Sequence, residues 1–117
     1  IWAKAGGRPT GKWYKEVGQG MGAVLTMSKD LKAYTLADRG TWISMETKLP
    51  GMAILEEGDA DLFNPYGVIA VNPAKYPNTN YMAAMQYIAW ITSVEGQRII
   101  REYRLGGKQL FYADAVR

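Results

Sequence analysis

The spacing of apolar residues along the chain predicts several helices. Apolar side chains recur every three or four residues over 21–31 and 81–91, which is typical of helices with one buried face. A further helix is expected from Trp42 to a point before Pro50-Gly51, with Thr41 as its N-terminal cap, and another after Ser93. The first five residues fit the last turn of a helix. The apolar spacing therefore predicts helices along much of the chain.

Runs of β-branched, aromatic and other apolar residues predict strands between these helices. The predicted strands cover residues 12–17, 33–38, 52–57 and 68–71. The last of them is a continuous apolar run, as expected for a buried strand. Gly106-Gly107 is expected to close the final helix, leaving residues 108–112 as an extended tail. Because strands alternate with helices, the pattern favours an α/β fold with a largely parallel sheet.

A glycine-rich turn joins the first predicted strand to the first long helix. Gly18, Gly20 and Gly22 occupy three of five positions, so the main-chain N–H groups there are open to a ligand. At a helix N-terminus such N–H groups and the helix dipole favour an anion. The alternative is a tight strand-to-helix connection that binds nothing.

Composition excludes several kinds of chemistry. The 117 residues contain no cysteine and no histidine, so a thiolate nucleophile, a cysteine metal site and a Ser-His-Asp hydrolase are all absent from this chain. The acidic stretch at Glu56, Glu57, Asp59 and Asp61 lacks the spacing of a calcium loop. The formal net charge of +3 is too small to indicate nucleic-acid binding. We therefore expect no catalytic residues, no metal and no cofactor.

Four segments occur in order along nearly the whole chain: Gly18-Gln19-Gly20-Met21-Gly22-Ala23, residues 33–41, residues 63–73 (FNPYGVIAVNP) and Gly107-Lys108-Gln109-Leu110-Phe111. Together they resemble the C-terminal part of the tungstate-binding proteins that serve ABC importers. In addition, Ser93-Val94-Glu95-Gly96-Gln97 is similar to a Ser-Pro-Glu-Gly-Gln helix start that is common in solute-binding proteins. Val94 replaces the proline, which weakens the signal for the first helical position but not for the cap.

The resemblance implies a type II periplasmic-binding-protein fold in which two lobes close on an oxyanion. Residues 1–64 would form the later part of lobe two, 65–71 the hinge or crossing region, and 72–117 the return helices of lobe one. Two donor-rich segments of the family, a Thr/Ser-rich one and an Arg-Gly-Asp-Asp-Ser-Gly-Thr one, are not present. The resemblance therefore implies a C-terminal fragment that would hold a minority of the site.

A tetrahedral dianion such as tungstate or molybdate only accepts hydrogen bonds, so its site needs converging donors. The match to the family assigns this role to the main chain of Met21 and Gly22, with Gly20 shaping the turn. Tyr34, Thr35 and Arg39 are further candidates, because the end of their predicted strand lies at the same sheet edge as the glycine turn. Each candidate also has an alternative role that involves no ligand. The Met21 side chain would pack in the core, and Tyr34 and Thr35 would occupy half-buried strand positions. Arg39 would pair with Asp38 or with the surface.

The function expected from the resemblance is that of an extracytoplasmic solute-binding component of an ABC importer. Its partners would be the oxyanion and the membrane permease, with self-association of the fragment and no nucleic acid. Its location would be periplasmic or extracellular, with a lipoprotein anchor in a Gram-positive cell. A ligand-sensing effector domain of a regulator with the same fold is the alternative. An enzyme acting on phosphate or sulfate esters ranks last.

Overall fold

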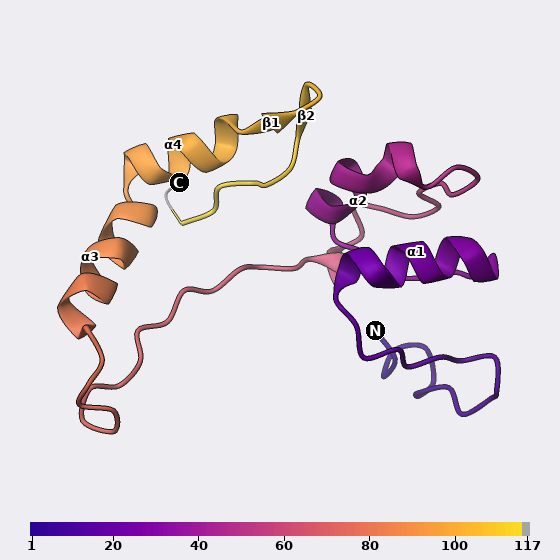
Figure 1. Cartoon of the computed structure of the whole chain (residues 1–117), viewed down its shortest axis with the longest axis horizontal. Coiled ribbons are helices and arrows are strands. Elements are labelled where there is room, and N and C mark those ends of the chain that lie inside the picture. Colours follow the sequence, from indigo (N-terminus) through magenta and orange to yellow (C-terminus); the bar gives the residue numbers. More distant parts are fainter. Residues whose placement is uncertain (116–117) are drawn as a thin grey trace. The chain divides into compact units, whose positions relative to one another are not determined.

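A computed structural model describes residues 1–115 of the protein. These residues form two compact units, the first comprising Ile1–Pro65 and the second beginning at Tyr66. Each unit is described by itself below, and both are drawn in Figure 1. The assignment of residues 1–64, 65–71 and 72–117 to lobes and a hinge stays a prediction.

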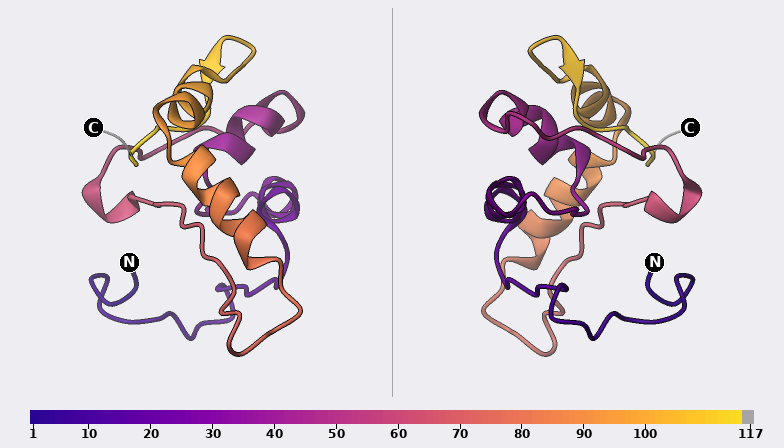
Figure 2. Two further views of the ribbon diagram at one scale, coloured as in Figure 1. Left: turned by 90° about the vertical axis from the view of Figure 1, so that its left-hand side faces the viewer. Right: turned by 90° about the vertical axis from the view of Figure 1, so that its right-hand side faces the viewer.

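Two helices organise the first unit. α1 (Met21–Leu31) matches the predicted range, and α2 (Arg39–Met45) continues into a short 3₁₀ turn, η1 (Glu46–Lys48). Figure 2 shows α1 almost end-on, with α2 beside it. Leu25 and Leu49 are the most deeply buried side chains, at 1% and 2% exposure, and Ile43 is also buried. Of the apolar residues that predicted α1, Leu25 is buried, whereas Leu31 at the end of the helix is 59% exposed.

The start of α2 differs from the prediction. The helix begins at Arg39, and its N-cap is Asp38. Asp38 accepts hydrogen bonds from both the main-chain N–H and the hydroxyl of Thr41, each at 2.7 Å. Thr41, which the sequence suggested as the cap, thus lies inside the first turn as a donor. A carboxylate is a strong cap because it also meets the positive end of the helix dipole.

Other parts of the first unit are irregular. Residues 1–5 form a helical turn in which the N–H groups of Lys4 and Ala5 donate to Ile1 O, without becoming a helix. A further 3₁₀ turn, η2 (Ala60–Leu62), begins after Asp59, whose side chain accepts from the N–H of Asp61. Lys4 and Asp61 form an ion pair between these two regions.

The second unit contains two consecutive helices and a small hairpin. α3 (Tyr81–Ile91) is capped by Asn80 and α4 (Val94–Glu102) by Ser93, so both predicted caps are confirmed. β1 (Arg104–Leu105) pairs with β2 (Lys108–Gln109) in antiparallel register. Gly106 and Gly107, with φ of 56° and 79°, form the two-residue turn between them. The glycine pair therefore turns a hairpin, and the prediction that it closes the helix and begins a plain tail is wrong.

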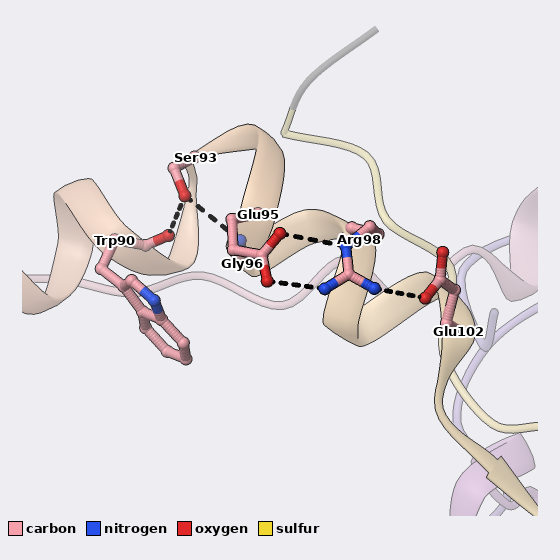
Figure 3. A network of polar contacts seen from close by, with 6 residues as sticks. All are labelled: Trp90, Ser93, Glu95, Gly96, Arg98 and Glu102. Atoms are coloured by element: carbon pink, nitrogen blue, oxygen red, sulfur yellow. Dashed lines mark hydrogen bonds and ion pairs between the residues drawn. The ribbon is translucent and has the colours of Figure 1, made fainter.

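Hydrogen bonds and ion pairs fix the junction between α3 and α4 (Figure 3). The hydroxyl of Ser93 donates to Trp90 O at 2.7 Å and accepts from the N–H of Gly96 at 3.1 Å. Arg98 bridges Glu95 and Glu102 on the exposed side of α4. The hydrogen bond from Arg98 holds the pKa of the Glu95 carboxyl below its usual range, and its two carboxylate partners raise the pKa of Arg98.

Gln97 connects three segments of the second unit. It is buried, its Nε2 donates to Ile91 O at 2.8 Å, and its Oε1 accepts from the N–H of Ala115 at 3.0 Å. The chain after β2 therefore returns to α4, with Leu110 buried on the way. The Gln97 side chain thus provides hydrogen-bond partners for two main-chain groups, one at the end of α3 and one after β2.

The main difference from the sequence prediction concerns the strands. Residues 12–17, 33–38, 52–57 and 68–71 form no β-ladder among residues 1–115, where β1 and β2 are the only strands. The segment expected to be most buried is open, since Ile69 is 89% exposed. A strand gains its stability from a paired neighbour, and these segments find none within the described chain.

Among residues 1–115, no helix is long and apolar enough to cross a membrane.

Candidate anion-binding site

The N-terminus of α1 presents main-chain donors that the described chain leaves unused. The first helical hydrogen bond runs from the N–H of Val24 to Gly20 O. Across residues 1–115 the N–H groups of Met21, Gly22 and Ala23 have no acceptor, and Gly20 offers no side chain as a cap. The first turn also contains no acidic residue. Three free donors at the positive end of an eleven-residue helix can hold an anion.

The three glycines of this turn have different structural roles. Gly18 has φ of 57°, a conformation that favours glycine, whereas Gly20 has φ of −65° and ψ of 160°, which any residue adopts. The turn is therefore made at Gly18 rather than at Gly20. A Cβ on Gly22 would lie 3.0 Å from the Sδ atom of Met45. The missing side chain of Gly22 thus allows α1 and α2 to approach, while its N–H stays open.

The other three predicted residues line a cavity of the first unit. This cavity, of about 700 Å³, is bounded by α1, by the beginning of α2 and by the extended segments 33–38 and 52–57. Tyr34, Thr35 and Arg39 are among its lining residues, while Gly20, Met21 and Gly22 are not. The structure therefore brings the predicted residues together in two groups of three, one at the helix terminus and one at the cavity.

The charge of Arg39 is already compensated. Its Nη1 lies 2.9 Å from the Oε2 of Glu57, in a pair whose side chains are 40% and 63% exposed. Asp38, the alternative partner suggested by the sequence, is occupied by Thr41. An anion that reaches Arg39 must compete with the Glu57 carboxylate, which would also repel it.

Glu57 is the residue at this site that the sequence did not single out. A signal was available, because the predicted strand 52–57 ends at Glu57 and the predicted strand 33–38 ends just before Arg39. Ends of neighbouring parallel strands meet at one sheet edge, so an acid–base pair could have been expected there.

The two residues that could donate a hydroxyl group, Tyr34 and Thr35, are weakly held by their surroundings. Tyr34 is 88% exposed, and the Thr35 hydroxyl donates to Leu36 O at 3.4 Å. Neither side chain is held in place by a strong hydrogen bond, so both remain able to turn toward a ligand. The acidic residues nearby do not gather into a group that could hold a metal ion within the described chain.

Comparison with known proteins places the chain in a class of ligand-binding proteins. The family described as the PBP superfamily domain matches residues 2–95. The chain belongs to the PBP superfamily.

Individual relatives show which members of the superfamily the chain is similar to. The chain is 45% identical over 97% of its length to the tungstate-binding protein TupA of Peptoclostridium acidaminophilum, and 40% identical over 98% to TupA of Campylobacter jejuni. A solved structure of the tungstate ABC transporter from Geobacter sulfurreducens superposes with a TM-score of 0.75 at 48% identity, covering 87% of this chain. The sequence resemblance and the type II fold class are thereby confirmed.

These relatives are considerably longer. The chain spans 38% of the Peptoclostridium protein, 44% of the Campylobacter protein and 43% of the Geobacter chain. The similarity therefore covers a part of each relative, consistent with a partial periplasmic-binding-protein fold.

Proposed function

We propose that this chain is the C-terminal part of the solute-binding component of an ABC importer, which binds a tetrahedral oxyanion between two lobes. Tungstate is the proposed ligand, with molybdate as the closely similar alternative. The unused N–H groups of Met21 and Gly22 carry the proposal. It is supported by the similarity, over nearly the whole chain, to proteins named for tungstate binding.

The chemistry of the donors suits this ligand. A tungstate dianion accepts hydrogen bonds and donates none, and main-chain N–H groups at a helix terminus are fixed donors with no acceptor beside them. The free amides of α1 supply such donors, and the first turn brings no carboxylate that would repel the ion. The ligand is bound and released unchanged, so the proposed role involves no catalysis.

The remaining donors would come from outside this chain. It spans about two fifths of its relatives, so the full protein would close a second lobe over the ion. The closed form would be presented to the membrane permease of the importer, which implies a periplasmic or extracellular location. A lipid anchor would retain it at the surface of a Gram-positive cell.

Calorimetric titration of the full-length protein tests this function. We expect saturable binding of tungstate with a Kd of about 1 µM or tighter, which corresponds to about −8 kcal/mol. Sulfate is the matched control, since it has the same charge and shape but is smaller, and it should bind much more weakly. Absence of heat with both tungstate and molybdate would overturn the proposal.

A charge substitution tests whether Arg39 takes part. Glu57→Gln removes the carboxylate that competes for Arg39 and should raise tungstate affinity by up to about fivefold, given the small free energy of an exposed ion pair. Glu56→Gln is the control, because this neighbouring carboxylate has the same charge but lies outside the cavity lining. Equal affinities in both variants would mean that Arg39 has a structural role only.

A further inference from the structure

The net charge of the chain is concentrated in the segment that precedes the glycine turn. Residues 1–17 carry four basic side chains and one acidic side chain, a net charge of +3, which equals the net charge of the whole chain. Residues 18–117 therefore contain as many basic as acidic side chains and are neutral overall. An uneven distribution of this kind produces a positive potential around the basic segment.

Two of the four cations in this segment, Lys4 and Arg8, are compensated by carboxylates. Each forms an ion pair, and the partner of Arg8 is Glu16, the single acidic residue of the segment. Lys12 and Lys15 are exposed, and neither has an ion-pair partner within residues 1–115. The positive potential of the segment therefore comes from Lys12 and Lys15.

These two lysines lie shortly before the free amides of α1 in the chain. Lys15 precedes Gly18, where the turn is made, by three residues, so their Cα atoms are at most about 11 Å apart. Figure 1 shows this part of the chain running directly into α1. The separation is similar to the Debye length in about 0.1 M salt, which is about 10 Å, so the charge of Lys15 still acts at the turn.

Other charged side chains do not cancel this potential at the turn. Met45 lies against Gly22, and η1 follows Met45 directly with one acidic and one basic side chain, so its net charge is zero. The first turn of α1 carries no charged side chain. The acidic side chains that approach the basic segment do so at its beginning, where a hollow is lined by Ile1, Lys4, Ala5, Glu56, Asp59 and Asp61. The charge next to the turn is therefore positive on balance.

We propose that Lys12 and Lys15 steer the oxyanion toward the free amides of Met21 and Gly22. This inference rests on the proposed function, which makes these amides part of the anion site. The lysines act over a distance by raising the local concentration of the anion, so they increase the rate of association rather than hold the bound ion. A dianion is attracted twice as strongly as a monoanion, which makes tungstate a suitable ligand for this effect.

Stopped-flow measurement of tungstate association with the full-length protein tests the steering. At about 0.01 M ionic strength we expect Lys12→Gln/Lys15→Gln to lower the association rate constant about 3- to 10-fold, while the dissociation rate constant changes less than about 2-fold. Lys12→Glu/Lys15→Glu doubles the change in charge and should cause a further loss of similar size. At about 1 M ionic strength, where the Debye length is about 3 Å, all three proteins should associate at the same rate.

Lys32→Gln is the matched control, because it removes an exposed lysine at the opposite end of α1, about 16 Å from Met21 along the helix axis. At about 0.1 M ionic strength it should lower the association rate constant less than Lys15→Gln does.

The possible results separate this inference from the proposed function. Equal association rates for the original protein and both double variants at low salt would overturn the steering, although tungstate binding itself would stand. A loss that appears in the dissociation rate constant instead would also overturn it, because the lysines would then hold the bound ion. A full-length protein that binds no tungstate would overturn the proposed function and this inference together.

Discussion

Replacing Met21 with proline is expected to weaken tungstate binding by the full-length protein by about 10- to 100-fold while leaving α1 intact. Met21 is the first residue of the helix, and its N–H has no acceptor within residues 1–115. Proline removes that N–H and fixes a φ that the first helical position already requires. A hydrogen bond to a charged group contributes about 1.5–3 kcal/mol, which sets the expected loss.

The residue before Met21 permits this substitution. A proline excludes helical ψ at the preceding position, and Gly20 already has φ of −65° and ψ of 160°. The helix should therefore keep its start, and circular dichroism should show unchanged helix content. Calorimetric titration measures the affinity.

A matched variant separates the main chain of Met21 from its side chain. Met21→Leu keeps the N–H and nearly the same volume, so it should bind tungstate as the original protein does. If Met21→Pro binds normally, the amide is not a ligand donor. If Met21→Leu loses affinity as strongly as Met21→Pro, the side chain rather than the N–H is responsible. Either result would remove the central donor from the proposed site.

The helices could be predicted from sequence because their signals are local. The apolar spacing over 21–31 and 81–91 and the caps Asn80 and Ser93 all act within one or two turns. The start of α2 was misassigned for a local reason too, because Asp38 and Thr41 are both good caps. The carboxylate is the one that accepts, and Thr41 donates to it.

The strands could not be predicted with the same success because pairing is not local. Residues 52–57 and 68–71 have strand-like composition, but composition does not supply the neighbour that a strand needs. The hairpin of β1 and β2 was missed because Gly106-Gly107 fits both a helix end and a two-residue turn. Left-handed φ at both glycines is the feature that selects the hairpin.

The candidate site was predictable to the extent that it depends on the main chain. The glycine turn before α1 indicated free amides, and the structure shows free amides there. The ion pair of Arg39 with Glu57 joins residues 18 positions apart, so it depends on how two extended segments are placed. The ends of the two predicted strands indicated that Arg39 and Glu57 could meet at one edge, but the pair itself was identified only in the structure.

Replacing Gly96 with alanine should give the largest loss of stability in the second unit. The added Cβ would lie 2.3 Å from Trp90 O and 2.9 Å from both the Cα and O atoms of Ile91. These are main-chain atoms at the end of α3, so they cannot rotate away as a flexible side chain could. The junction would have to open, which also strains the hydrogen bond from Gln97 to Ile91 O.

We expect this substitution to lower the free energy of unfolding of the full-length protein by about 1–3 kcal/mol, the usual cost of an overpacked site. Alanine favours a helix over glycine by about 1 kcal/mol, so packing and propensity act in opposite directions and packing should prevail. Gly67→Ala is the control, because no atom lies within 4 Å of the added Cβ and the change should be near neutral. Urea unfolding measures both variants, and a Gly96→Ala protein as stable as Gly67→Ala would show that α3 and α4 do not meet at this distance.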